Sequence, residues 1–412
     1  MKIVSKFFVV FISFFIFCSS IFAFEINSDK AILINLTDDS VIYSKNSEEK
    51  TSVASLTKMM TAIVAIENID DFEEKVFVTN EDWKGLVEND ASVANFVRYR
   101  KYSYMELLYG LMLPSGADAA HALARLVGGN IPNFVKMMND KAKELGLNNT
   151  SFANPTGLDD KNNYSTASDM AMLLKYGIKN EVFKKVITTM EYTTHDGIVL
   201  RHTIDKYSKM RNISIPGLLG GKTGSTDDAG VCLASIAEFQ DVNYLLVVLN
   251  AKFPYQLIDS KTIYEYYMNN YGYQILINKG DVLVNLDTLY TKDKNIDILS
   301  KDVYSYYLSN DYEKKNMVLE YDGVDVVTYK MRKGDKLGKV SLYYDDKLME
   351  EIDIYLDRDM SFDLVGFFMT NVVYFVLGFG LLLVLIIVLL VIRHKKKLRK
   401  DVIVVDCVEE IL

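Results

Sequence analysis

The sequence has few of the residues on which disulfide-rich and metal-binding proteins depend, and it lacks the excess of basic residues that is typical of nucleic-acid-binding proteins. It contains three cysteines and four histidines in 412 residues. The histidines show no metal-ligand spacing with one another or with acidic residues, so we expect no metal site and no other cofactor. The formal net charge of -9 argues against nucleic acid as a partner. The sequence also shows no internal repeat and no low-complexity tract.

The first 23 residues have the composition of a secretory signal peptide. Two lysines precede an apolar run that begins at Phe7, and the small residues Ser19 and Ser20 come before Ala23. This order of charged, apolar and small residues is typical of a cleavable export signal. We therefore predict that residues 1–23 direct export, with cleavage after Ala23.

A second apolar segment lies near the other end of the chain. Residues 364–392 contain no charged residue, and residues 372–392 are long enough to cross a bilayer. The alternative, a buried core helix, is disfavoured because the segment has no polar face. The basic block RHKKKLRK follows directly, and such blocks stay in the cytoplasm. We expect a single span of the cell membrane at 372–392, a cytoplasmic tail at 393–412, and the body of the protein on the outer side.

The predicted export also determines which cysteines could form a disulfide. Cys18 lies in the predicted signal and Cys407 in the predicted tail, so Cys232 is the one cysteine of the exported part. No disulfide within the chain is then possible. The exported part must depend on its hydrophobic cores for stability.

Between the two apolar ends, the hydrophobic pattern changes twice. Two short strands are expected within residues 31–44, helical periodicity extends from 53 to about 174, and a hairpin is expected over 231–251. Strands from both ends of this region enclose a helical block, which suits an antiparallel sheet covered by helices. We therefore predict an α+β domain over residues 24–272.

Residues 273–360 have a different pattern. Short segments of alternating polar and apolar residues are separated by turn residues, which predicts a small all-β domain. This region contains no concentrated cluster of polar residues. We expect a spacer or docking module rather than a second enzyme.

The first candidate site is the stretch SVASLTKMM at residues 52–60. Ser55 and Lys58 are three residues apart, so on a helix their side chains lie on one face. The apolar run that follows would bury both, and a buried amine either pairs with an acceptor or loses its proton and becomes a base. The alternative is that Ser55 only caps the helix while the amine of Lys58 reaches solvent.

Two further stretches complete a pattern. PSGADAA at residues 114–120 places Ser115 on a turn that opens a helix, and GKTGST at residues 221–226 places Lys222 just before a strand. Ser-x-x-Lys, then Ser-x-Asn, then Lys-Thr-Gly on a strand is the order found in the serine acyl-transfer enzymes that react with penicillin. The three matches together are far more specific than any one of them.

With these motifs in an exported chain, residues 24–360 resemble the low-molecular-mass penicillin-binding proteins of the serine-type D-alanyl-D-alanine carboxypeptidase family. Residues 31–65 and 144–175 are also similar to signatures of that family. The resemblance implies a β-lactamase-like transpeptidase domain, then an all-β domain and membrane attachment. It also implies a penicillin-sensitive hydrolase of cell-wall synthesis and remodelling, which removes the terminal D-alanine from peptidoglycan stem pentapeptides.

The resemblance further implies roles for individual residues. Ser55 would be the nucleophile that forms the acyl-enzyme, and Lys58, in its neutral form, would take the proton. Ser115 would relay a proton to the leaving amine. Lys222 would help to lower the pKa of Lys58. The backbone N–H groups of Ser55 and Ser225 would form the oxyanion hole.

Substrate binding is implied for the third motif and for an arginine. Lys222, Thr223 and Gly224 would bind the anionic end of the substrate, and an arginine would help to hold its carboxylate. Arg201 is the candidate for that arginine. Arg211 is the other possibility, because an insertion around KYSKMRNIS obscures the alignment.

One residue departs from the family pattern, because Ala117 stands where the second motif has asparagine. That amide normally orients the substrate and bonds the first lysine. A catalytically weakened protein that binds peptidoglycan or a partner is therefore the alternative function. A β-lactamase is a third hypothesis, since Glu144 in ELGLN also fits a class A β-lactamase motif, although the same segment fits a helix end with a surface glutamate.

Overall fold

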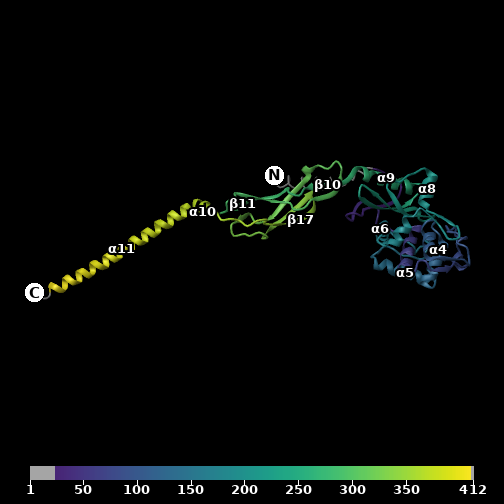
Figure 1. The fold of residues 1–412 in the computed structure, drawn as a ribbon, viewed down its shortest axis with the longest axis horizontal. Coiled ribbons are helices and arrows are strands. Elements are labelled where there is room, and N and C mark those ends of the chain that lie inside the picture. Colours follow the sequence, from purple (N-terminus) through teal and green to yellow (C-terminus); the bar gives the residue numbers. More distant parts are fainter. Residues whose placement is uncertain (1–23, 410–412) are drawn as a thin grey trace, which may run out of the picture. The chain divides into compact units, whose positions relative to one another are not determined.

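The structure is a computed structural model that describes residues 24–409 (Figure 1). The chain forms two compact units, and the first gives way to the second between Asn269 and Asn270. The predicted signal peptide, residues 1–23, lies outside the described residues.

The first unit contains a five-stranded antiparallel sheet with the order β2-β1-β9-β8-β7. Its strands come from both ends of the unit, as the hydrophobic pattern predicted. They are β1 (Lys30–Asn35), β2 (Ser40–Lys45), β7 (Leu218–Thr226), β8 (Gly230–Phe239) and β9 (Val242–Ala251). Because β7 is at the edge, one row of its backbone groups is not paired within the sheet.

Helix α2 (Thr57–Ile66) is the centre of the helical part of this unit. All ten of its residues are buried, which follows from a sequence that is apolar on every side. It packs against five other helices. These are α3 (Tyr104–Met112), α4 (Ala117–Gly128), α5 (Ile131–Glu144), α6 (Ala167–Gly177) and α7 (Glu181–Thr188).

The remaining elements of the first unit are short or lie beside the sheet. The 3-10 turns are η1 (Ala54–Leu56) and η2 (Glu81–Trp83), and the two small hairpins pair β3 (Lys75–Phe77) with β4 (Lys101–Ser103) and β5 (Glu191–Thr193) with β6 (Val199–Arg201). Helices α8 (Thr203–Arg211) and α9 (Tyr255–Asn270) precede and follow strands β7 to β9 along the chain. Cys232 in β8 is fully buried, and burial raises the pKa of its thiol to about 12.

The second unit begins with three small sheets, so the prediction of an all-β domain is confirmed. Alternate residues of strand β16 (Lys336–Tyr344) are buried, namely Val340, Leu342 and Tyr344, as expected for a strand with one face on a core. The sheets pair β10 (Tyr271–Ile277) with β13 (Tyr304–Ser309), β11 (Val282–Leu289) with β12 (Asn295–Leu299) and β15 (Val326–Thr328), and β16 (Lys336–Tyr344) with β14 (Met317–Gly323) and β17 (Lys347–Tyr355). The 3-10 turn η3 (Lys314–Asn316) precedes β14.

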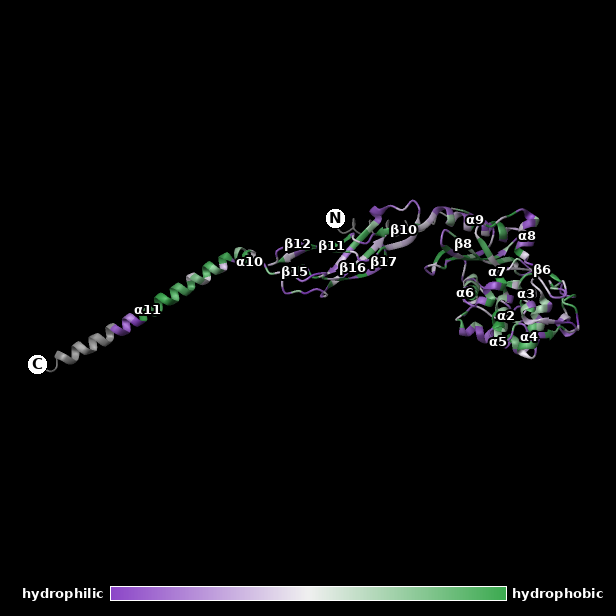
Figure 2. Cartoon of the chain, in the orientation of Figure 1, coloured by the Kyte–Doolittle hydropathy of each residue, from purple (hydrophilic) through white to green (hydrophobic). Residues whose placement is uncertain are grey.

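Two helices follow the strands of the second unit. The short helix α10 (Leu364–Thr370) leads into α11 (Val372–Glu409), whose first half is strongly apolar (Figure 2). A stretch of 26 residues, Val372–Lys397, is long and apolar enough to cross a membrane, and its side chains are not buried against the protein. The predicted long apolar helix at this end of the chain is therefore present.

Candidate active site

Ser55 and Lys58 are brought together at the start of helix α2. Ser55 lies in turn η1, and the Nζ of Lys58 is 2.9 Å from the Ser55 Oγ. Lys58 is only 2% exposed, so its amine does not reach solvent. The same amine is 2.5 Å from the backbone oxygen of Thr156. The spacing Ser-x-x-Lys thus gives the contact that it predicted.

The Thr156 carbonyl is held in place by the loop that contains it. The Asn154 Oδ1 accepts hydrogen bonds from the backbone N–H groups of Thr156 and Gly157. Gly157 has φ +81°, and a Cβ there would be 2.0 Å from the backbone oxygen of Ala54. Only glycine therefore allows this loop to pack against the turn that carries Ser55. The loop gives Lys58 a fixed acceptor.

The electrostatics of Lys58 suit a base. Burial lowers its pKa to about 7, and the negative charge of Asp118 opposes this by raising it. A large fraction of Lys58 is therefore neutral near neutral pH. A neutral amine can donate an N–H to the Thr156 oxygen while its lone pair accepts the hydroxyl proton of Ser55.

A second lysine and serine lie together in the same way. Lys222, in β7, is 0% exposed and donates hydrogen bonds to the Ser115 Oγ at 2.9 Å and to the Thr223 oxygen at 2.8 Å. The pKa of Lys222 is well below its ordinary value, first because of burial and second because of the charge of Lys58. The repulsion between the two lysines favours a state in which they are not both charged.

The backbone is strained beside both serines. Ala54, just before Ser55, has φ +47°, and Ser115 itself has φ +66°. Residues other than glycine rarely adopt these values, and strain of this kind is concentrated at functional sites.

Gly224 of the third motif allows strand β7 to approach Ser55. A Cβ at Gly224 would lie 3.0 Å from the Val53 oxygen and 3.1 Å from the Ser55 nitrogen. Since both neighbours are backbone atoms, a side chain would require β7 or turn η1 to shift by a few tenths of an ångström. The backbone of β7 near Ser225 and the backbone of Ser55 therefore face the same space.

That space is a cavity of about 340 Å³. It brings residues of all three motifs together, and the two buried lysines contact its serine hydroxyls from the protein side. The lining residues are Ser55, Ser92, Ser115, Thr203, Tyr207, Met210, Thr223, Gly224, Ser225, Val231, Phe253 and Gln256.

Helix α8 forms a wall of this cavity that the sequence interpretation missed. Thr203, Tyr207 and Met210 lie at i, i+4 and i+7, which places them on one face of the helix. The Thr203 hydroxyl is 2.6 Å from the Thr223 hydroxyl, and the ring of Tyr207 contacts that of Phe253 edge to face at 5.5 Å. The segment KYSKMRNIS, treated as an insertion, belongs to this wall. Its helical spacing was the available signal.

His202 fixes the start of this wall. Its Nε2 donates to the Gly221 oxygen at 2.9 Å, and its Nδ1 accepts the N–H of Ile204 as the N-cap of α8. Burial lowers the pKa of His202 to about 4, so the ring is neutral. The histidine ties α8 to β7.

The two candidate arginines lie in different places. Arg201 is exposed and forms an ion pair with Glu191 at 2.8 Å, and it does not line the cavity. The structure therefore does not bring Arg201 to the other site residues. The guanidinium of Arg211 lies 4.7 Å from the ring centroid of Phe253, a lining residue.

Gln256 is a further polar residue that the motifs did not reveal. It lines the cavity from the first turn of α9 and is only 1% exposed. Its Oε1 is buried and has no hydrogen-bond partner within the described part of the chain. Buried polar atoms are normally paired, so the missing partner makes this carboxamide a candidate for contact with a ligand.

The departure at Ala117 leaves no side-chain amide at the start of α4. Ala117 is 1% exposed, and its N–H donates to the Ser92 oxygen at 2.8 Å. The neighbouring Asp118 turns away from the cavity and accepts the N–H groups of Ala94 and Phe96. Burial raises the pKa of Asp118. The loop that brings Ser92 to the cavity is therefore held by Asp118.

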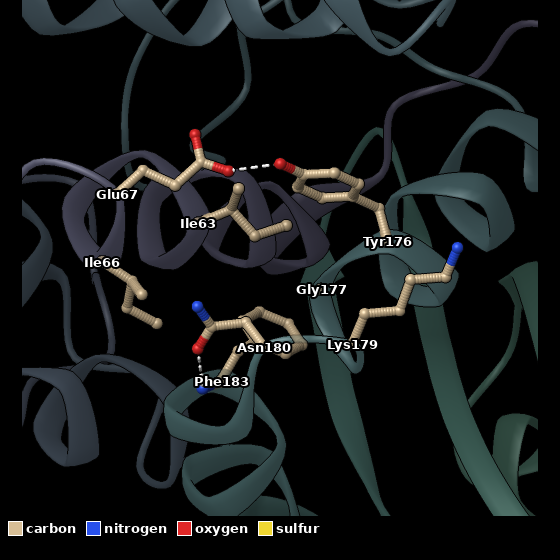
Figure 3. Close-up of a pocket in the computed structure, with 8 residues that line it drawn as sticks. All are labelled: Ile63, Ile66, Glu67, Tyr176, Gly177, Lys179, Asn180 and Phe183. Atoms are coloured by element: carbon tan, nitrogen blue, oxygen red, sulfur yellow. Dashed lines mark hydrogen bonds between the residues drawn. The ribbon is translucent and has the colours of Figure 1, made fainter.

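Other candidate features lie elsewhere. A cavity of about 220 Å³ at the far end of α2 is shown in Figure 3, where Glu67 accepts a hydrogen bond from the Tyr176 hydroxyl, but no serine, threonine or cysteine lines it. Glu144 is on the surface and pairs with Lys141 at 2.8 Å, in line with its structural interpretation. Among the residues that the structure describes, no group of three or more His, Cys, Asp or Glu could hold a metal ion.

This fold, with the three motifs around one cavity, is that of the penicillin-binding serine enzymes. Comparison with known proteins gives the family. A family model described as D-alanyl-D-alanine carboxypeptidase matches residues 19–253, and one described as penicillin-binding protein 5, C-terminal domain, matches residues 271–361. The chain belongs to the D-alanyl-D-alanine carboxypeptidase family and carries the C-terminal domain of penicillin-binding protein 5.

Individual relatives agree with this assignment. The D-alanyl-D-alanine carboxypeptidase DacF of Bacillus subtilis is 30% identical over 341 residues, which are 80% of this chain and 85% of the relative. The structure of penicillin binding protein 5 from Haemophilus influenzae matches with a TM-score of 0.60 at 24% identity and covers 82% of this chain and 98% of that one. A Streptomyces K15 DD-transpeptidase mutant matches with a TM-score of 0.53 at 30% identity and covers 59% and 98%.

Proposed function

We propose that this chain is an active serine-type D-Ala-D-Ala carboxypeptidase, which removes the terminal D-alanine from peptidoglycan stem pentapeptides through an acyl-enzyme on Ser55. The observation that carries the proposal is the 2.9 Å contact between the Ser55 hydroxyl and a buried Lys58 with a pKa of about 7. A serine needs a base to become a nucleophile at neutral pH, and this lysine can act as that base.

Acylation would begin with transfer of the Ser55 hydroxyl proton to Lys58 while the Ser55 Oγ attacks the carbonyl carbon between the two D-alanines. The N–H groups of Ser55 and Ser225 would hold the oxyanion. As the peptide bond breaks, Ser115 would give its proton to the leaving amine. Ser115 would then recover the proton that Lys58 took from Ser55, relayed through Lys222, whose amine already donates to the Ser115 hydroxyl. D-alanine leaves, and the peptide remains as an ester on Ser55.

Deacylation would return the enzyme to its starting state. Lys58, neutral again after passing on its proton, would take a proton from water as the water oxygen attacks the ester carbonyl. The bond to Ser55 then breaks, and Ser55 recovers a proton. The shortened stem peptide is released with a new carboxylate.

The terminal carboxylate of the substrate would lie toward the wall formed by β7 and α8. Lys222 would supply a buried amine donor there, and Thr223 and Gly224 would supply the strand edge. Arg211 is the last residue of α8, and its guanidinium contacts Phe253, which lines the cavity, so Arg211 is favoured over Arg201. β-Lactams would acylate Ser55 as substrate analogues and act as inhibitors.

A catalytically weakened protein that binds peptidoglycan or a partner is the second candidate, because Ala117 gives the site no amide at that position. Two buried lysines beside two hydroxyls are costly to desolvate, and a protein that only binds has no need of them. We therefore favour turnover.

Membrane attachment completes the proposal. Residues 1–23 would be the export signal, 24–272 the catalytic domain and 273–360 the all-β domain, both outside the cytoplasm. Residues 372–392 of α11 would span the cell membrane, and the basic residues 393–412 would lie in the cytoplasm.

The test is D-alanine release from diacetyl-Lys-D-Ala-D-Ala by the detergent-solubilised chain, compared with Ser55→Ala and Ala117→Asn. Release that is lost in Ser55→Ala establishes the carboxypeptidase. Labelling of Ser55 by penicillin without D-alanine release, with release gained in Ala117→Asn, establishes the weakened protein instead. Rapid turnover of penicillin would indicate a β-lactamase.

A further inference from the structure

The second unit is joined to helix α11 without a free linker. Met360 is 5% exposed and belongs to the hydrophobic core of the unit. Phe362 forms an antiparallel bridge with Thr291, and the N–H of Asp363 donates to the Tyr290 oxygen at 2.9 Å. Met360, Phe362 and Asp363, which connect the core to α10, are thus all held by contacts with the unit.

Helix α10 is attached in the same way. The ring of Phe367 contacts that of Tyr290 at 4.9 Å and that of Phe362 at 5.6 Å, and Phe362 contacts Tyr329 at 4.6 Å. The side chain of Asn371, the last residue before α11, donates to the Tyr290 hydroxyl at 3.2 Å. If the apolar part of α11 lies in a membrane, Tyr290 lies at its boundary.

Two loops of the second unit begin at this boundary. Tyr290 and Tyr329 are the residues that follow the paired ends of β11 and β15, where Leu289 is opposite Thr328. Because these strands are parallel, their carboxyl ends meet at one edge, and the loops 290–294 and 329–335 leave from the same place.

The chemistry of the two loops suits a lipid surface. They contain five exposed cations and two carboxylates, in a chain whose net charge is -9. None of the five forms an ion pair within the described part of the chain. Tyrosine rings are enriched at the boundary between water and lipid, and basic side chains near a membrane are attracted to anionic headgroups. The five cations are Lys292, Lys294, Lys330, Arg332 and Lys333.

The outer face of α10 is apolar. Phe367 faces the unit, whereas four other side chains of the helix region are between 49% and 71% exposed. Exposing these apolar side chains to water is unfavourable, and they would be buried if α10 entered the upper part of the bilayer next to the span. The four are Leu364, Val365, Phe368 and Met369.

We propose that this end of the second unit, consisting of residues 290–294, 329–335 and 363–371 and called here the membrane collar, lies in the headgroup layer of the outer leaflet. Its cations contact anionic phospholipid and the apolar face of α10 enters the acyl region. The all-β domain is then docked on the membrane rather than tethered to it. The proposal rests on the span in α11 and is independent of catalytic activity.

The test places a fluorescent label at single introduced cysteines in the full chain, reconstituted into vesicles that contain nitroxide-labelled lipid. Cys18→Ser and Cys407→Ser remove other sites, and Cys232 is buried. Lys330→Cys and Met369→Cys probe the collar. Lys347→Cys is the matched control, because the nine residues of β16 place that turn about 30 Å from the collar. Ile387→Cys reports whether α11 is inserted.

We expect strong quenching at positions 330, 369 and 387 and little at 347. We also expect quenching at position 330 to be severalfold stronger with phosphatidylglycerol in the vesicles than with phosphatidylcholine alone. Quenching at 387 with equally weak signals at 330 and 347 would overturn the collar. Equal quenching at 330 in both lipids would overturn the role of the cations. No quenching at 387 would refute the span, and the collar with it.

Discussion

The acylation rate of Ser55 is expected to depend on pH through the protonation of Lys58. Only the neutral amine can take the serine proton, so activity is gained as the pH rises through the pKa of about 7 and lost as it falls. At pH 5 about 1% of Lys58 would be neutral, against about half at pH 7, which predicts a loss of about 50-fold. Above pH 8 the gain is less than about twofold.

This expectation differs clearly from that for an ordinary lysine. With a pKa near 10.5, the neutral fraction would rise about tenfold for each pH unit up to pH 9 without a plateau. The assay is stopped-flow measurement of the second-order rate constant for acylation by a fluorescent penicillin between pH 5 and 9. A rate that keeps climbing tenfold per unit beyond pH 8, or one that does not change at all, would refute the role of Lys58.

The substitution Asp118→Asn tests the link between the pKa of Lys58 and the pH profile more directly. Its charge raises the pKa of Lys58, so Asp118→Asn removes that effect and moves the midpoint of the profile to lower pH. The plateau rate is expected to fall as well, because an asparagine can accept only one of the N–H groups of Ala94 and Phe96 through its oxygen. The midpoint and the plateau report the two effects separately. An unmoved midpoint would show that Asp118 does not influence Lys58.

Three substitutions test other parts of the site and fold. Gly224→Ala is expected to lower acylation at least about 100-fold with little change in melting temperature, because its Cβ displaces β7 from the Ser55 backbone; acylation within about twofold of the parent would contradict this reasoning. Gln256→Leu is expected to raise KM for the tripeptide about tenfold while leaving thermal stability unchanged or higher, since it removes an unpaired buried oxygen; a lower melting temperature with unchanged KM would mean that the amide is structural. Arg125→Ala leaves the fully buried Asp82 without its partner at 2.8 Å and is expected to cost about 3 kcal/mol of unfolding free energy in urea titrations, without moving the pH midpoint of acylation.

Local patterns in the sequence were sufficient to predict the features of the site that depend on residues close together in the chain. The Ser55–Lys58 contact follows from helical spacing, and the burial of Lys58 follows from an apolar run that leaves α2 no polar face. Four of the five strands of the sheet were predictable because they alternate or are continuously apolar and are bounded by turns, whereas β7 has neither pattern, and Lys222 lies within this strand rather than just before one. The fold class needed no more than this.

Features of the site that depend on tertiary contacts could not be predicted from the sequence. The acceptor for Lys58 is a backbone oxygen, that of Thr156, and a backbone atom has no residue-type signal. Gln256 reaches the cavity because of where α9 begins after the sheet, and α8 becomes a wall only when His202 bonds to β7. Arg201 is the opposite case. Its residue type and its place in the sequence made it a candidate for the site, but its exposed side chain in strand β6 pairs with Glu191 instead.

The burial of Cys232 has a consequence for how the protein matures. It is the single cysteine among the residues whose side chains the structure describes, and its thiol is inaccessible and held protonated by the raised pKa. The described fold therefore requires no oxidant and no disulfide-forming catalyst to reach its final state. Its stability is expected to be the same under oxidising and reducing conditions.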